Sequence, residues 1–141
     1  MRELEKELRE RFPEVEIFEH SPRRLYLTIG KERIREIAQF LFKEKGLRLS
    51  IMTGIDTREG IEVLYHFSED KTGTYWTVKV LLDKAKPKVD TISDITKAAS
   101  WIEREIWELL GVEFIGHPNL IPLLTAEDWP RDKFPLRRDY E

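Results

Sequence analysis

Apolar residues recur at helical and then at strand spacing along the first third of the chain. Segment 2–12 repeats them every fourth residue, at Leu4, Leu8 and Phe12, and ends at Pro13. Two strand-like runs follow, 14–19 and 24–29, and the second alternates apolar with polar residues. Residues 31–45 have the spacing of a second helix, with apolar positions Ile34, Ile37, Ala38 and Leu41 before a stop at Gly46.

Alternating apolar residues predict three more strands after this helix. The first contains Leu47, Leu49 and Ile51 and precedes the chain breakers Gly54 and Gly60. The others are centred on 61–67 and 74–83, and a charged link, 84–89, leads to a last helix. The order predicts an α+β fold, a mostly antiparallel sheet of four to five strands with helices packed on one face.

The last helix is expected to start at Thr91, which forms a capping pattern with Asp94, and to end at Gly111. Its apolar stripe predicts the core face: Ile95, Ala98, Ala99, Ile102, Ile106, Leu109 and Leu110. Trp101, Arg104 and Glu108 share a face that this stripe leaves free, while Glu103 and Trp107 lie on the opposite flank. Because Trp and Arg are enriched at interface hot spots, the free face predicts a partner contact. The alternative is that Trp101 covers an edge of its own domain.

Segment 112–141 is apolar without being periodic, so the chain divides into a domain, 1–111, and an extended tail, 112–141. Gly116-His117-Pro118 predicts a turn that His117 holds locally. Four prolines interrupt the apolar residues beyond it, which include Trp129 and Phe134. A long apolar tail without regular structure favours a strap across a neighbouring subunit. The alternative is that it wraps back over its own sheet.

Composition excludes several classes of function. A chain of 141 residues with net charge −3 is one domain without the basic surface that nucleic-acid binding requires. It has no cysteine, which excludes disulfides, thiol nucleophiles and iron–sulfur ligation. No apolar run approaches the roughly 20 residues of a spanning helix, and the charged N-terminus indicates a cytosolic chain. A single Asn and a single Gln among many charges favour a hyperthermophile source.

Catalytic motifs are not found. The three histidines lack metal-ligand spacing, and the glycines form no nucleotide-binding motif. Glu103, Glu105 and Glu108 are the densest carboxylates, and Glu105 is expected to be partly buried. They leave open an acid/base role in a small hydrolase.

Two linked motifs closely resemble those of one protein family. The first runs Glu103-Arg104-Glu105, Trp107 to Val112, Phe114, then Gly116-His117-Pro118; the second is Pro135-Leu136-Arg137-Arg138-Asp139-Tyr140. Together they resemble the C subunit of NADH–quinone oxidoreductase, the cluster-free small subunit of the complex I peripheral arm, with relatives in membrane-bound energy-converting [NiFe] hydrogenases. Asn119, and Asp132-Lys133 before Phe134, depart from the common complex I pattern and favour the hydrogenase-like branch.

The resemblance implies a non-catalytic scaffold in a respiratory, ion-translocating complex. Such a subunit binds no cofactor and docks on the large catalytic subunit, beside a cluster-bearing small subunit. Iron–sulfur clusters and the [NiFe] or quinone site lie in these partners. The complex sits on the cytoplasmic face of the membrane, which this chain reaches only through other subunits. Expected interface residues are Trp101, Arg104, Glu105, Trp107, Glu108, His117, Trp129, Phe134, Arg137 and Arg138.

A second hypothesis stays open at this point. The chain could be a free-standing binding module without a redox role that buries its apolar tail against another copy of itself. A discrete homo-oligomer of the isolated chain would distinguish this module from a scaffold subunit.

Overall fold

A computed structural model describes residues 2–118. The predicted order of helices and strands is confirmed, with two short strands in addition. The elements are α1 (Glu3–Arg11), β1 (Glu16–Ser21), β2 (Arg24–Thr28), η1 (Lys31–Arg33), α2 (Ile34–Gln39), η2 (Phe40–Glu44), β3 (Arg48–Asp56), β4 (Ile61–Glu69), β5 (Thr74–Leu82), β6 (Lys88–Asp90), α3 (Ala98–Leu110) and β7 (Glu113–Ile115). The predicted second helix is thus a 3₁₀ turn, an α-helix and a π-helical turn.

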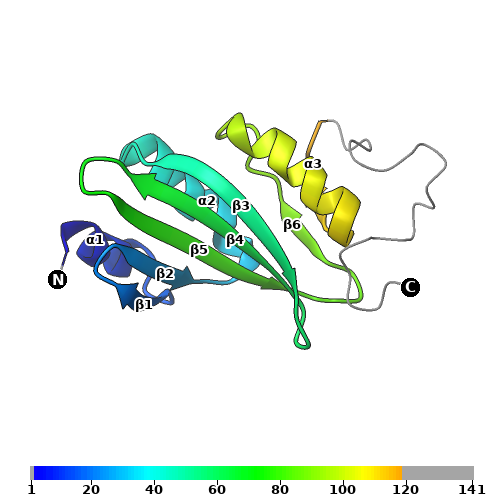
Figure 1. Cartoon of the computed structure of the whole chain (residues 1–141), viewed down its shortest axis with the longest axis horizontal. Helices are drawn as coiled ribbons and strands as arrows, with labels where there is room; N and C mark the ends of the chain where they lie inside the picture. Colours follow the sequence, from blue (N-terminus) through cyan, green and yellow to red (C-terminus); the bar gives the residue numbers. More distant parts are fainter. Residues whose placement is uncertain (1, 119–141) are drawn as a thin grey trace.

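The main sheet has five strands in the order β1-β2-β5-β4-β3. All its pairs are antiparallel except β2 with β5. This mixed α+β architecture is the predicted one. In Figure 1, α2 crosses behind the sheet and α3 lies beside β3, so the face toward the reader is the one opposite α2.

One face of the sheet, here called the inner face, holds the core. Alternate residues of β2, β4 and β5 point into it, among them Leu27, Tyr65 and Trp76, all fully buried. α1 contributes Leu4 and Leu8, and α2 contributes Ile34, Ile37 and Ala38. The helices therefore cover the inner face, while the other face, called the outer face below, carries side chains such as Phe18 and Ile51 that remain exposed.

Two predictions for β3 are wrong. Ile51 is 53% exposed, because a bulge between Leu49 and Ile51 shifts the register and gives the inward position to Met52. Gly54 does not end the strand, which continues to Asp56. It allows α3 to approach instead: a Cβ atom at Gly54 would lie 2.4 Å from Leu110 Cδ1.

β6 and β7 lie where the sequence predicted a charged link and the beginning of the tail. They form a separate parallel pair that joins Lys88–Asp90 to Glu113–Ile115. The Thr91 N–H extends the ladder by donating to the Ile115 carbonyl at 2.9 Å. The folded domain therefore continues at least to Ile115.

α3 starts seven residues later than predicted. Lys97 occupies the N-cap position without a side-chain hydrogen bond, so the expected Thr91–Asp94 cap is wrong. The predicted stripe is confirmed for Ala99, Ile106 and Leu110, whereas Ala98 is exposed. Gly111 ends the helix at φ +80°, in the left-handed region, as predicted. None of the helices within residues 2–118 is long and apolar enough to cross a membrane.

Candidate functional site

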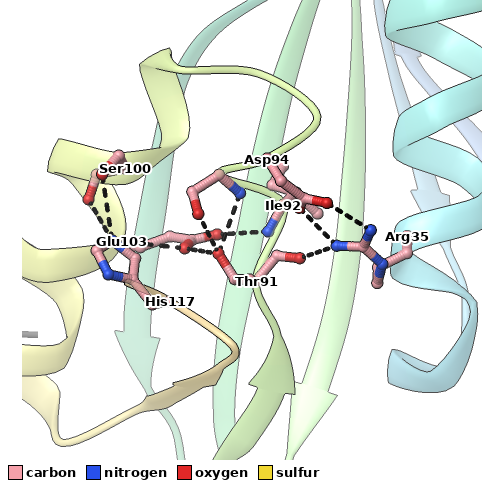
Figure 2. A network of polar contacts seen from close by, with 8 residues as sticks. Arg35, Thr91, Ile92, Asp94, Ser100, Glu103 and His117 are labelled. Atoms are coloured by element: carbon pink, nitrogen blue, oxygen red, sulfur yellow. Dashed lines mark hydrogen bonds and ion pairs between the residues drawn. The ribbon is translucent and has the colours of Figure 1, made fainter. Parts of the chain in front are cut away.

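The most unusual group in the domain is the carboxyl of Glu103, which is fully buried in the middle of α3. One oxygen, Oε2, accepts a hydrogen bond of 2.9 Å from the backbone N–H of Ile92. The other, Oε1, accepts a hydrogen bond from the hydroxyl of Thr91. Figure 2 shows both bonds crossing from α3 to the segment that follows β6. Glu103 therefore fastens α3 to that segment.

Burial raises the pKa of Glu103 to about 7, from an ordinary value of 4.5. The cause is desolvation, which disfavours the charged carboxylate. The bonds from Ile92 and Thr91 oppose the shift because they favour the charged form. Glu103 is therefore a carboxyl whose protonation changes near neutral pH.

Arg35 connects the same segment to α2. Its guanidinium donates to the Thr91 carbonyl at 2.7 Å and pairs with both carboxylate oxygens of Asp94, at 2.7 and 2.8 Å (Figure 2). Such a two-bond arginine–carboxylate pair fixes orientation as well as distance. The segment 91–94 is thus held from both sides, by Arg35 of α2 and Glu103 of α3.

His117 binds to α3 on the other side of Glu103. Its Nε2 lies 2.9 Å from the Ser100 carbonyl and 3.3 Å from the Ser100 hydroxyl. The same nitrogen is 4.0 Å from Glu103 Oε1 (Figure 2). The backbone N–H of His117 closes a turn onto Phe114, and Gly116 takes φ +88°. The predicted turn is confirmed, and His117 holds it against the helix.

Three of the expected interface residues lie together on the accessible side of α3. Trp101 is 55% exposed, and its indole N–H donates to the carboxylate of Glu105. The guanidinium carbon of Arg104 lies 5.9 Å from the centre of the Trp101 ring. The indole is thus exposed but held by contacts with both Glu105 and Arg104. We call Trp101, Arg104 and Glu105 the Trp101 face.

The remaining expected interface residues are placed differently. Glu108 is buried, 5% exposed, although its spacing predicted a free face with Trp101. Trp107 is half-buried and packs against the core. His117 is engaged with Ser100, as described. Trp129, Phe134, Arg137 and Arg138 lie outside the described residues.

The predicted cluster of three carboxylates does not form a common site. Glu103 is enclosed between α3 and the segment after β6, whereas Glu105 faces the indole of Trp101. Within residues 2–118, no group of three His, Asp or Glu side chains is arranged to hold a metal ion. The arrangement is one that orders elements relative to one another and presents an exposed aromatic side chain.

Comparison with known proteins identifies the family. Residues 27–141 match the model of the respiratory-chain NADH dehydrogenase 30 Kd subunit. The chain belongs to this family. The resemblance seen in the two sequence motifs is thereby confirmed.

Relatives of this family occur in several kinds of oxidoreductase. The chain is 36% identical to the C subunit of NADH-quinone oxidoreductase of Chloroherpeton thalassium, over 74% of this chain and 45% of that protein. It is 32% identical to formate hydrogenlyase subunit 5 of Escherichia coli, over 94% of this chain and 24% of that protein. It is 31% identical to the C subunit of F(420)H(2) dehydrogenase of Methanosarcina mazei, over 93% of this chain and 85% of that protein. The first two relatives are thus more than twice as long as the matched region.

Solved structures show the same fold. A chain of the membrane-bound sulfane sulfur reductase, described as an archaeal respiratory membrane complex, superimposes with a TM-score of 0.88 at 28% identity, over 99% of this chain and 84% of that one. A trypsin-resistant fragment (1–134) of Nqo5 gives a TM-score of 0.71 at 27% identity, over 83% of this chain and 98% of the fragment.

The predicted position of Glu103, on a flank of the last helix, is wrong, because its carboxyl is buried. A stripe defined by the apolar residues alone leaves it on a flank of the helix. Ala99 lies four residues before it and Ile106 three residues after it, and both are buried, so helical spacing does put Glu103 on the buried face. The spacing of Glu103 from these two apolar residues therefore predicts that it is buried. Its partners, the Ile92 N–H and the Thr91 hydroxyl, come from a short non-helical segment that the sequence assigns to the helix.

Proposed function

We propose that this family member is a non-catalytic structural subunit of a membrane-associated, multi-subunit oxidoreductase, either an energy-converting hydrogenase or a complex I-like enzyme. It docks on the large catalytic subunit of the cytoplasmic arm. The observation that carries this proposal is the Trp101 face, an exposed indole fixed in place on the last helix. The iron–sulfur clusters and the [NiFe] or quinone site belong to the partner subunits.

The Trp101 face has the physical properties of an interface anchor. Its indole offers a large apolar surface with two rotatable bonds, so little conformational entropy is lost on binding. Arg104 and Glu105 hold the ring before any partner arrives. A stable contact would need roughly 1,000 Å² or more of buried surface around it. The residues expected to supply more of that area are Trp129, Phe134, Arg137 and Arg138.

The buried contacts of Glu103 and the neighbouring contact of His117 support the same role. Glu103 fixes the segment after β6, and His117 fixes the end of the described chain to Ser100 of α3. The point from which residues 119–141 continue is therefore set relative to Trp101. A rigid arrangement of this kind reduces the entropy cost of binding one partner at two places.

The relatives support an assembly with a large subunit. In formate hydrogenlyase subunit 5 the matched region is 24% of the protein, so the equivalent domain is joined to a much larger remainder in one polypeptide. A covalent link of this kind keeps two parts at a high effective concentration. We infer that the remainder of that protein corresponds to the large subunit on which the present chain docks, on the cytoplasmic face of the membrane.

The test is the affinity of the full chain for the large subunit after replacement of Trp101. Trp101→Ala removes the anchor, and hot-spot truncations cost about 2 kcal/mol or more, which corresponds to about a thirtyfold loss of affinity. Trp101→Phe, which keeps an aromatic ring, and Lys97→Ala, at an exposed neighbouring position, serve as matched controls that should bind within a few-fold of wild type. Unchanged affinity of Trp101→Ala would show that docking uses another surface.

A further inference from the structure

The outer face of the sheet carries most of the exposed apolar side chains of the described chain. Seven large apolar residues are strongly exposed within residues 2–118, and five of them lie on this face: Phe18, Ile51, Ile55, Tyr75 and Leu81. The other two, Trp101 and Ile115, belong to α3 and β7. Single exposed apolar residues are ordinary, so the feature that suggests a binding surface is the gathering of five of them on one face of the sheet.

The pairing of the strands places these residues in rows. Phe18 pairs with Tyr26, Tyr26 with Thr77, Thr77 with His66, and His66 with Ile51. Directly paired residues point to the same face, so this row crosses all five strands. Figure 1 shows that no helix of the described chain crosses this side of the sheet. A partner would contact a row of side chains that ends in the aromatic Phe18 on one side and the aliphatic Ile51 on the other.

The centre of the row is polar and internally satisfied. His66 Nδ1 lies 2.9 Å from the Thr77 hydroxyl, and Nε2 lies 3.1 Å from the Thr53 hydroxyl. Burial and the nearby positive charge of Arg24 lower the pKa of His66, so its ring is neutral at neutral pH. His66 therefore orders the surface without adding charge to it.

A shallow groove of about 300 Å³ opens on this surface, and its charge is unbalanced. It is lined by Arg24, Tyr26, Ser50, Ile51, His66, Tyr75 and Thr77. Among these described residues, Arg24 alone carries a charge. Nearby ionic side chains are paired on this face, Lys79 with Glu62 at 3.2 Å and Arg48 with Asp70 at 3.4 Å. No ion pair or hydrogen bond engages the Arg24 guanidinium within the described part of the chain.

We propose that the outer face is a second docking surface, for an apolar segment of another protein subunit that places an Asp or Glu carboxylate on Arg24. The rows through Ile51 and Tyr75 receive the apolar side chains, and the hydroxyls of Ser50 and Thr77 border the ion pair. A second copy of this chain fits less well, because a two-fold contact through the groove would bring Arg24 against Arg24. The inference rests on the proposed function only in taking the partner from the same assembly.

α3 packs on the inner side of β3, where Ile106 and Leu110 cover Gly54. The outer face therefore lies across the sheet from α3. Loss of binding at the Trp101 face can accordingly be measured separately from loss of binding at the outer face.

The first test uses a single introduced thiol, since the chain has no cysteine of its own. Ile51→Cys is incorporated into the assembled complex and reacted with a maleimide, with Glu10→Cys on exposed α1 as control. We expect Ile51→Cys to react at least tenfold more slowly in the complex than in the free chain, and Glu10→Cys to react equally in both. A benzophenone maleimide attached to the thiol of the Ile51→Cys variant should link to a peptide of another subunit that contains Asp or Glu. Equal labelling would overturn the proposal, as would a linked peptide from a second copy, from residues 119–141, or without an acidic residue.

The second test reverses the charge. Arg24→Glu should weaken retention of the linked subunit at least tenfold, Arg24→Lys should restore most of it, and Arg58→Glu, at an exposed position outside the groove, should leave it unchanged. Retention unaffected by Arg24→Glu would contradict the charge assignment. If Trp101→Ala leaves the large subunit bound while the Arg24 variants behave as expected, the proposed docking through the Trp101 face fails and the outer-face inference stands. If Trp101→Ala releases the large subunit but Arg24→Glu has no effect, the outer-face inference fails and the proposed function stands.

Discussion

At the scale of single residues, the buried carboxyl of Glu103 makes folding dependent on pH. Its folded-state pKa of about 7 exceeds the ordinary value of 4.5, so the folded state binds the proton more tightly than the unfolded state. The folded state is therefore favoured below about pH 4.5. This advantage is lost as the pH rises from there through 7.

Glu103→Gln removes the titrating group while keeping a similar shape. We expect wild type to lose on the order of 3 kcal/mol of unfolding free energy between pH 4.5 and 8 from this residue. The Gln variant should lack that loss, because a neutral amide does not titrate. Urea unfolding of the full chain at pH 5 and pH 8 measures the difference.

Glu113→Gln, at an exposed position of β7, is the matched control and should keep the pH dependence of wild type. If Glu103→Gln keeps it as well, the carboxyl of Glu103 is already ionised at pH 5 in the folded protein. The role assigned to desolvation would then be wrong.

At the scale of elements, the contact of α3 with β3 sets the position of the Trp101 face. Gly54 leaves room for Leu110 and Ile106, the nearest atoms to a Cβ at that position. α3 would have to move away from the sheet if a larger residue stood there. Glycine therefore acts here through its small volume in the middle of a strand.

Gly54→Val should lower the unfolding free energy by about 1–3 kcal/mol, because its side chain overlaps Leu110. Gly54→Ala should cost less, since the flexible end of Leu110 can turn aside. The double variant Gly54→Val with Leu110→Ala should be more stable than the sum of the two single changes predicts, and a double-mutant cycle by urea unfolding measures this coupling. Strict additivity would show that the two residues do not share the space.

Long periodic elements of this fold could be predicted from the sequence, and short ones could not. β4, β5 and the first helix follow from apolar spacing alone. β6 and β7 have three residues each, too few for a periodic pattern, and they pair across more than twenty residues of chain. The bulge before Ile51 reverses an alternation that the sequence shows as continuous. Likewise, the helical face of Trp101 predicts its exposure, whereas its bond to Glu105 is visible only in the structure.

At the scale of the whole molecule, the domain presents two surfaces with different chemistry. The Trp101 face is a single aromatic anchor in contact with Arg104 and Glu105, and the outer face combines exposed apolar side chains with the cation of Arg24. α3 packs on the inner side of β3, and the core draws residues from all three α-helices and from strands β2 to β7 within the described chain. If both proposals hold, the domain joins two neighbouring subunits at once.

Removal of residues 119–141 should leave the domain folded and abolish most of its binding. The described core includes residues from Leu4 to Phe114, and the homologous Nqo5 fragment is described as trypsin-resistant. We expect the unfolding free energy to stay within about 2 kcal/mol of the full chain, and affinity for the large subunit to fall more than tenfold. Circular dichroism with urea unfolding measures the first and a binding titration measures the second. An unfolded truncated chain would place the tail in the domain's own core.

The central claim is that the chain is a scaffold subunit, and co-purification from native membranes tests it most directly. The tagged full chain is recovered after mild solubilisation, and its partners are identified by mass spectrometry. The account predicts a large subunit, of the [NiFe]-hydrogenase type or its complex I counterpart, together with a cluster-bearing small subunit. Recovery of the chain alone, or with further copies of itself and nothing else, would contradict the scaffold role and favour the homo-oligomeric module.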